Sequence, residues 1–288
     1  MNHTITPQQL HQANIEVINP NIERGKIRYA LFDFDGTVSL IREGWQGIMI
    51  PMMVDLLEQT PQAEDHSKIE QVVKEFVTQL TGKQTIYQMI RLCEEIQKRG
   101  GTPQDPLHYK YLYNEKLNGH IKERIALLRE RKVAPQEMAV PGVYEWLRIL
   151  KARQVHCFLA SGTDEKYVFE EAALLKLPPY FEAIYGAKDD YKNFSKKMLI
   201  DKIIQEHQLH GSEFVAFGDG YVEIEDTKSV GGIAVGVASN EKDRSGIDAW
   251  KRERLIAAGA DVIIPDFRCA AILEQYLFEG ADDALSKV

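Results

Sequence analysis

The chain has 288 residues, of which 44% are hydrophobic, and a formal net charge of −8. This length suffices for one large domain or for a core domain that carries a smaller inserted one, and the composition is that of a folded globular protein. The chain has no dense cluster of Lys and Arg, which argues against nucleic acid as a main partner because a phosphate backbone binds to a basic face.

The amino-terminal residues 1–20 are polar and lack the basic and apolar regions of a secretory signal. No later stretch approaches the roughly 20 consecutive apolar residues that cross a bilayer. We therefore expect a cytoplasmic protein with no membrane partner.

Short apolar segments that favour strands alternate with helical patterns along most of the chain. The first, 28–34 (RYALFDF), stops at Asp35-Gly36, as a buried strand does at a turn. Similar segments follow at 155–160, 182–185, 214–217, 233–237 and 261–264. Amphipathic helical stripes at 142–152 and 196–205 lie between them. This alternation predicts a Rossmann-like, three-layer α/β core with a parallel sheet, whose ligands bind beyond the carboxyl ends of the strands.

One interval breaks the alternation, because it contains helical patterns and no convincing strand. Amphipathic helices are predicted here at 67–80, 86–98 and 107–131. We therefore predict an all-helical cap domain at 45–135, inserted into a core domain that consists of 1–44 and 136–288.

The first motif with chemical potential is Asp33-Phe34-Asp35-Gly36-Thr37-Val38, at the end of the first predicted strand. Strand alternation would place Asp33 and Asp35 on the same side of the sheet edge. Two carboxylates this close repel each other unless a cation neutralises them or one of them holds a proton. One can then attack as a nucleophile while its neighbour transfers a proton. A turn rich in Asp and Gly without catalytic function is the simpler alternative.

Two further polar groups come after the first motif. Ser161-Gly162-Thr163 follows the second predicted strand, where a small hydroxyl and a glycine suit a phosphoryl oxygen, although Ser161 alone could cap the next helix. Lys196 precedes an apolar helical stripe and could neutralise a nucleophile and a transferring phosphoryl group. The neighbouring Lys197 competes for this role.

The last group is acidic and begins at Gly218-Asp219, directly after a predicted strand. Glu223, Glu225 and Asp226 follow it within one or two helical turns. Hard oxygen ligands of this kind suit Mg²⁺. The alternative is an acidic helix start, which the helix dipole favours.

These four groups, in this order, resemble the motifs of the haloacid dehalogenase superfamily of phosphotransferases. The family signature DxDGT[VL] is matched by DFDGTV, and it is followed by a Ser or Thr, a Lys before a helix and an acidic GD motif, here Ser161, Lys196 and Asp219. The resemblance covers about 26–44 and 139–267. The helical insert after the first motif resembles the family's first type of cap, as in the phosphoglycolate phosphatase and β-phosphoglucomutase branch.

The resemblance implies a mechanism. Asp33 would attack phosphorus and become an aspartyl-phosphate, while Asp35 would protonate the leaving alcohol and later deprotonate the hydrolytic water. Mg²⁺ would be held by Asp33, the backbone carbonyl of Asp35 and Asp219. The family commonly has a second Asp four residues beyond the first acid, where this chain has Glu223; Glu225 and Asp226 are the alternatives for completing the metal site.

The resemblance also implies that Ser161 and Lys196 bind the phosphoryl oxygens. Arg42 and Trp45 lie at the junction of core and cap, and Lys83 lies in 81–85, our candidate for a cap loop that points into the site. A surface lysine and a packing tryptophan are the simpler readings of Lys83 and Trp45. The full set of expected substrate contacts is Gly36, Thr37, Arg42, Trp45, Lys83, Gly162 and Thr163.

We predict a magnesium-dependent phosphatase that acts on a small phosphorylated metabolite, such as a sugar phosphate, as a monomer or homodimer. A phosphomutase of the same superfamily would share the chemistry up to the aspartyl-phosphate. The alternative from another class is a binding or regulatory module that has this fold without catalysis.

Overall fold

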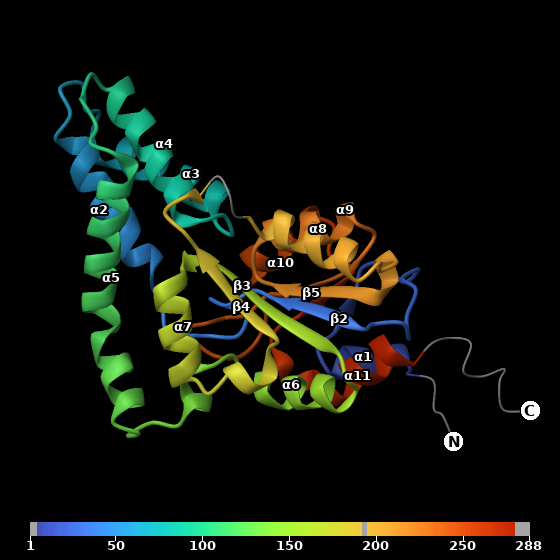
Figure 1. The fold of residues 1–288 in the computed structure, drawn as a ribbon. Helices are drawn as coiled ribbons and strands as arrows, with labels where there is room; N and C mark the ends of the chain where they lie inside the picture. Colours follow the sequence, from blue (N-terminus) through green and yellow to red (C-terminus); the bar gives the residue numbers. More distant parts are fainter. Residues whose placement is uncertain (1–4, 192–194, 280–288) are drawn as a thin grey trace, which may run out of the picture.

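The computed structural model describes residues 5–191 and 195–279, and within them a central sheet of seven strands carries helices on both faces (Figure 1). The strands are β1 (Glu16–Val17), β2 (Tyr29–Phe32), β3 (His156–Asp164), β4 (Ala183–Ala187), β5 (Phe214–Gly218), β6 (Ile233–Val237) and β7 (Val262–Ile264). Their order in the sheet is β1-β7-β6-β5-β2-β3-β4. Strands β2 to β7 are parallel, which confirms the predicted α/β core.

The edge strand β1 was not predicted, and it makes the sheet mixed because it pairs antiparallel with β7. It has only two residues, Glu16 and Val17, both partly exposed. So short a segment carries no alternation that a sequence pattern could reveal.

The two faces of the sheet are covered by different helices (Figure 1). One face carries α1 (Pro7–Gln12), α6 (Val143–Ala152), α7 (Glu165–Leu174) and α11 (Ala270–Phe278), and the other carries α8 (Lys196–Glu206), α9 (Tyr221–Ser229) and α10 (Ala249–Ala257). Short 3-10 turns lie at Pro135–Met138, Pro178–Tyr180, Gly211–Glu213 and Phe267–Cys269. This arrangement buries both faces of the parallel strands and leaves their carboxyl ends free to form a site.

The central strand β2 shows how the apolar residues fill both layers. Leu31 packs with Leu199 of α8 on one face. Phe32 lies on the other face, where it stacks on Phe217 of β5 with ring centroids 4.7 Å apart, and Phe217 in turn contacts Trp146 of α6. Alternate residues of one strand therefore anchor both helical layers.

A group of helices follows β2 in the chain and stands beside the sheet (Figure 1). These are α2 (Gln46–Glu58), α3 (His66–Leu80), α4 (Thr85–Lys98) and α5 (Pro106–Arg129). Residues 45–135, all of which the structure describes, contain no strand. The predicted inserted helical unit is therefore confirmed as part of the fold.

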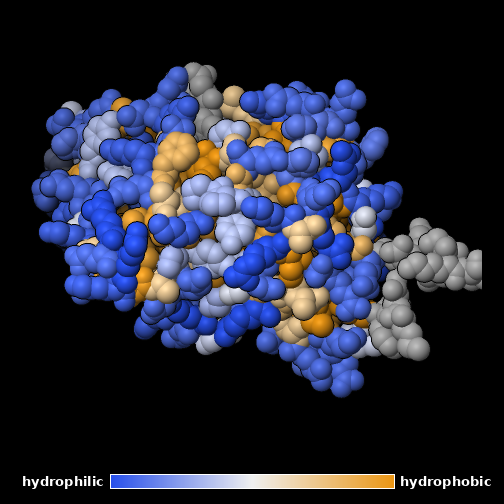
Figure 2. All heavy atoms as spheres, turned by 60° about the horizontal axis from the view of Figure 1, so that its bottom comes forward, coloured by the Kyte–Doolittle hydropathy of each residue, from blue (hydrophilic) through white to orange (hydrophobic). Residues whose placement is uncertain are grey.

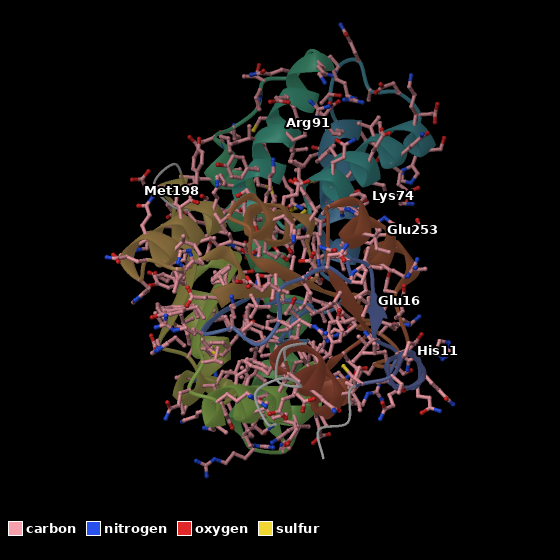
Figure 3. All side chains as sticks on the ribbon, turned by 90° about the vertical axis from the view of Figure 1, so that its right-hand side faces the viewer. His11, Glu16, Lys74, Arg91, Met198 and Glu253 are labelled. Carbon is pink, nitrogen blue, oxygen red and sulfur yellow. The ribbon has the colours of Figure 1, made fainter. Side chains whose placement is uncertain are left out.

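Helix α3 illustrates why these segments are helical. The Asp65 side chain accepts a hydrogen bond from the Lys68 N–H at 3.1 Å, which caps the start of the helix. Val73 and Val77, one turn apart, are fully buried, whereas Lys74 is exposed and labelled at the outer surface in Figure 3. The buried stripe therefore faces the neighbouring helices, as the sequence pattern predicts.

The outer surface is mainly hydrophilic on the face that Figure 2 shows, with apolar side chains in small groups. Among the described residues, the large exposed hydrophobic side chains come from separate elements: Ile18, Tyr111, Phe169, Met198 and Trp250. None of the helices in the described part of the chain has the length and apolar character needed to span a bilayer.

Two expectations about strand ends were wrong. Strand β2 ends at Phe32, so Asp33 and Asp35 lie in the following loop and strand alternation does not orient them. Strand β3 continues through Ser161 to Asp164, with a register shift after Ala160, and α7 begins only at Glu165. Strand β3 extends to Asp164 because Asp164 pairs with Ala187 of the edge strand β4. Ser161 therefore lies inside a strand and does not cap a helix.

Gly142→Ala is expected to destabilise the fold by about 2–5 kcal/mol. Gly142 has φ +79°, and an added Cβ would lie 2.3 Å from the backbone carbonyl carbon of Phe267. Urea unfolding would measure the loss. Gly47→Ala is the matched control: Gly47 lies inside α2 with no atom near an added Cβ, so this change should be neutral or stabilise by up to ~1 kcal/mol. Equal effects of the two substitutions would contradict this account.

Candidate active site

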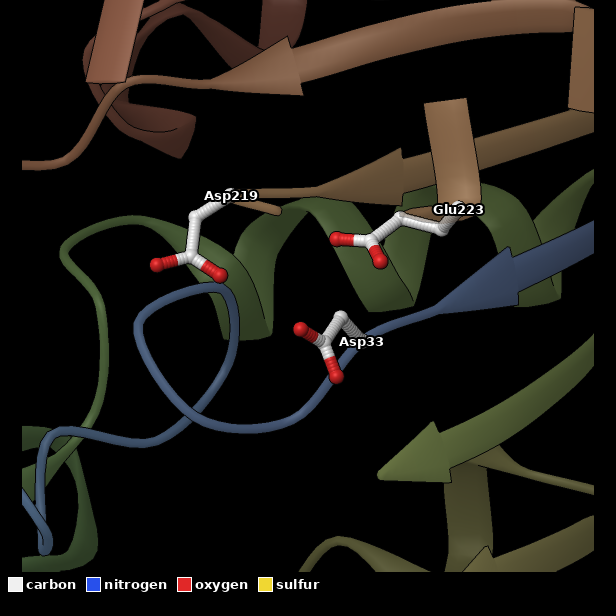
Figure 4. A group of neighbouring side chains, drawn as sticks. All are labelled: Asp33, Asp219 and Glu223. Atoms are coloured by element: carbon white, nitrogen blue, oxygen red, sulfur yellow. The ribbon is translucent and has the colours of Figure 1, made fainter. Parts of the chain in front are cut away.

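Three carboxylates meet at the carboxyl ends of the central strands (Figure 4). Asp33 follows β2, Asp219 follows β5, and Glu223 lies in the first turn of α9. Each offers an oxygen atom, and these oxygens lie within 4.8 Å of one another. Asp33 and Glu223 are buried. Clustered carboxylate oxygens are the donors that Mg²⁺ prefers, so the donor set fits that ion.

A buried lysine links two of these carboxylates. The Lys196 Nζ lies 2.8 Å from Asp33 Oδ1 and 2.9 Å from Glu223 Oε2. Ser195 places it by capping α8, since its hydroxyl accepts a hydrogen bond from the Met198 N–H at 3.1 Å. The other candidate, Lys197, is exposed and pairs with Asp201 of its own helix. Of the two lysines, the structure therefore brings Lys196 to Asp33.

The environment of Asp33 favours its neutral form although Lys196 lies beside it. Burial raises the pKa of Asp33 well above its usual range, and the charge of Lys196 opposes this rise. The neighbouring carboxylates of Glu223 and Asp219 raise the pKa further. A cation among these oxygens would favour the ionised form, which is the form that can act as a nucleophile.

Asp35 is held by two hydroxyls from β3. Its Oδ2 accepts hydrogen bonds from Thr163 Oγ1 at 2.9 Å and from Ser161 Oγ at 3.2 Å, while the Thr163 N–H donates to Ser161 Oγ at 3.0 Å. Asp35 Oδ1 is buried and has no hydrogen-bond partner among the described residues. Burial raises the pKa of Asp35, although the charge of Arg42 and these hydrogen bonds lower it. A raised pKa favours the protonated carboxyl, which a general acid requires.

Arg42 is anchored by a buried carboxylate. Its Nε and Nη2 donate to Glu171 Oε1 at 3.0 and 2.7 Å, and both side chains are buried. Burial raises the pKa of Glu171 to about 7, against the lowering effect of the Arg42 charge. The guanidinium also lies 5.2 Å from the centre of the Tyr167 ring. Arg42 thus lies at the site as predicted, but an internal ion pair occupies much of its hydrogen-bonding capacity.

A cavity of about 90 Å³ lies between these residues and the helices α2, α4 and α5, with the loop that joins α3 to α4. Ten predicted site residues line it: Asp33, Asp35, Arg42, Trp45, Lys83, Ser161, Gly162, Thr163, Lys196 and Asp219. Gly36, Thr37 and Glu223 are not part of this lining, and Thr37 is fully buried. Thr81, Gly82 and Thr85, from the candidate cap loop 81–85, also line the cavity. The lining residues that sequence reasoning missed are Met49, Gln88, Tyr113 and Glu241.

The loop between α3 and α4 closes over the core at two glycines. A Cβ on Gly162 would lie 2.9 Å from the carbonyl oxygen of Lys83, and one on Gly82 would lie 3.3 Å from the Cα of Gly220. Gly82 has φ +98°. Glycine at these positions lets the backbone of the loop approach the strand ends closely. The loop therefore reaches the site, and its exposed residue Lys83 is part of the cavity lining.

Comparisons with known proteins place this arrangement in a family. The model of the haloacid dehalogenase-like hydrolase family, described as a hydrolase, matches residues 27–231, which is more than half of the chain. The chain belongs to this family. None of the curated proteins matches the sequence.

Solved structures show the same fold as this haloacid dehalogenase-like hydrolase. A β-phosphoglucomutase from Clostridium difficile is 15% identical, with 87% of this chain and 97% of that chain covered and a TM-score of 0.56. A predicted phosphoglycolate phosphatase from Haemophilus somnus 129pt is 17% identical, with 86% and 97% covered and a TM-score of 0.56. A predicted phosphatase from Clostridium acetobutylicum is 18% identical, with 88% and 100% covered and a TM-score of 0.56.

The hydrolase site also contains a second lysine cluster that sequence reasoning missed. Lys251 of α10 lies 2.7 Å from Asp219 Oδ2 and 2.7 Å from Glu241 Oε1. Ser239 and Glu241 follow β6, so polar residues after a parallel strand were an available signal for them. Lys251 stands inside a helical pattern, and nothing local in the sequence separates it from surface lysines.

The remaining acidic candidates lie apart from the carboxylate group. Glu225 is exposed and Asp226 is half-buried, whereas Glu223 is 1% exposed and accepts hydrogen bonds from Lys196 and from the Gly220 N–H at 2.8 Å. Of the three acids, only Glu223 shares the group with Asp33.

Asp226→Asn is expected to raise the melting temperature at about pH 7.5 by about 2–4 °C. Burial raises the pKa of Asp226 to about 6, so the folded state binds this proton more tightly than the unfolded state. The associated stability is present below the unfolded pKa near 4 and is lost as the pH rises through about 6. Screening at this half-exposed side chain leaves about 1 kcal/mol. Thermal melts from pH 4 to 8 test this, and a gain that persists unchanged toward pH 4 would contradict it.

Proposed function

We propose that this hydrolase is a phosphatase that cleaves a small phosphomonoester through a covalent intermediate on Asp33. The observation that carries the proposal is the position of Asp33 in the cavity lining. Its carboxylate lies 2.8 Å from the buried Lys196 ammonium and shares a group of oxygens with Asp219. A nucleophile, a fixed cation and a cation-binding oxygen group thus meet at one place.

The proposed reaction proceeds in two displacements. An oxygen of Asp33 attacks phosphorus as the bond to the alcohol oxygen breaks, and Asp35 gives its proton to that departing oxygen. Asp35 then takes a proton from water, whose oxygen attacks the same phosphorus and breaks the bond to Asp33, which releases phosphate. The raised pKa of Asp35 supports the first role, and the Ser161 and Thr163 hydroxyls hold its carboxyl in place for both.

Residues around Asp33 would bind and orient the phosphoryl group. Lys196 carries the positive charge nearest to the attacking oxygen, and Ser161 and Gly162 line the same cavity. Asp33, Asp219 and the backbone carbonyl of Asp35 would hold Mg²⁺, with Glu223 beside them. When bound, this ion would neutralise negative charge on the phosphoryl oxygens.

The substrate we propose is a small phosphorylated metabolite such as a sugar phosphate. A cavity of about 90 Å³ favours a small leaving group, and the loop between α3 and α4 restricts its reach. Trp45 offers an apolar wall, and Gln88 and Tyr113 offer polar atoms within the lining. These side chains come from the helical unit, which would thus select the alcohol part of the ester.

A panel of phosphorylated metabolites, assayed for phosphate release with Mg²⁺ and with EDTA, tests the proposal. We expect release that requires Mg²⁺ and ranks small esters above large ones. Sugar phosphate isomers belong in the same panel, because conversion of one isomer to another without phosphate release would indicate a phosphomutase. Inactivity in both assays, with intact fold, would favour a binding module instead.

A further inference from the structure

The cluster around Lys251 joins three loops at the rim of the candidate cation site. Its ammonium contacts Asp219 Oδ2 and Glu241 Oε1, each at 2.7 Å, and Ser239 Oγ at 3.1 Å. The Ser239 hydroxyl in turn donates to the Gly36 carbonyl at 2.5 Å. The Lys251 side chain is 10% exposed, so these contacts replace most of its water.

Asp219 packs closely against this cluster. Gly36 lies so close that an added Cβ would be 2.2 Å from Asp219 Oδ2, the oxygen that Lys251 contacts. One oxygen of Asp219 is therefore enclosed between the loop after β2 and the Lys251 ammonium. The same carboxylate offers an oxygen that lies within 4.8 Å of oxygens of Asp33 and Glu223 (Figure 4).

The charges around the site follow a paired pattern. Lys196 joins Asp33 to Glu223, and Lys251 joins Asp219 to Glu241. Each lysine thus offsets the negative charge of one of its two carboxylates. The two lysines and four carboxylates together retain negative charge, which a divalent cation would neutralise. A change of one unit charge within several ångströms of a divalent ion, at an effective dielectric constant of roughly 20, changes its affinity by more than tenfold.

We propose that the Lys251 ammonium, held against the Asp219 carboxylate, acts through its charge to set the affinity of the site for a divalent cation. The positive charge of Lys251 repels a divalent ion bound at Asp219 and so weakens the binding of that ion. The negative charge of Glu241 partly cancels this repulsion. This inference rests on the proposed function through the cation that the site would hold. A lysine that only stabilised the fold would leave the affinity for the ion unchanged.

Titration calorimetry with Mg²⁺ alone, on the full chain without substrate, tests the inference. Lys251→Met is expected to bind Mg²⁺ at least about tenfold more tightly than the wild type, and Glu241→Gln at least about tenfold more weakly. Lys251→Arg keeps the charge and should stay within threefold. Lys202→Met, on the exposed side of α8, is the matched control for loss of a lysine charge and should not change the affinity.

The two substitutions separate an electrostatic role from a structural one because they must act in opposite directions. Circular dichroism establishes which variants are folded, and Glu241→Gln keeps the test decisive if Lys251→Met does not fold. Unchanged affinities, or shifts in the same direction, would overturn the inference while leaving the proposed function intact. Failure of the wild type to bind Mg²⁺ would overturn the metal assignment of the proposed function and this inference with it.

Discussion

Asp33→Asn is expected to lower the rate of phosphate release by about 10⁴–10⁶-fold, the loss that follows removal of a covalent nucleophile. An amide cannot replace the carboxylate as the attacking group, and it also removes an oxygen ligand from the carboxylate group at the strand ends. Initial rates with a preferred ester and Mg²⁺ measure the effect.

The Asp33→Asn protein should remain folded, because the substitution removes a buried carboxyl whose pKa burial raises. Thermal melts of both proteins provide the control. Activity within tenfold of the wild type would remove Asp33 from the mechanism, and an unfolded variant would make Asp33→Glu the comparison to use.

Lys196→Met is expected to destabilise the protein by about 3–5 kcal/mol and to abolish most of its activity. The substitution leaves Asp33 and Glu223 buried beside each other without their shared cation. Urea unfolding at neutral pH measures the loss of stability. The loss should shrink as the pH falls, because burial raises the pKa of Asp33 and the protonated carboxyl no longer needs a counter-charge.

Lys197→Met is the matched control for this experiment. Lys197 is the next residue on α8, is exposed and forms a surface pair with Asp201, so its removal should change stability by less than about 0.5 kcal/mol. Equal effects of the two substitutions would show that the position of Lys196 at Asp33 has no energetic consequence.

The layers of the fold follow from local patterns in the sequence. Strands β2 to β7 are apolar segments bounded by turns, and α3 to α5 carry stripes such as Val73 and Val77, so their type was predictable. Their exact ends were not, because pairing with neighbours decides them. Strand β3 runs on to Asp164 beside β4, and β2 stops at Phe32 before the two aspartates.

The predicted site residues meet because the carboxyl ends of parallel strands, and the loops that follow them, lie at one edge of the sheet. This rule brings Asp33, Ser161 and Asp219 to one cavity. It does not choose between adjacent lysines, since Lys196 and Lys197 differ only in the direction they face from α8. The partners Glu171, for Arg42, and Lys251, for Asp219, come from distant helices, so no spacing in the sequence announces them.

The most direct test of the central claim is to trap the covalent intermediate and locate it in the chain. The Asp35→Asn variant, incubated with p-nitrophenyl phosphate and Mg²⁺ and then reduced with borohydride, should convert one aspartate to homoserine, because that leaving group needs no proton while hydrolysis of the intermediate lacks its base. Peptide mass spectrometry is predicted to find the conversion at Asp33. Wild-type phosphatase activity together with no conversion at Asp33, or conversion at another residue, would contradict the account.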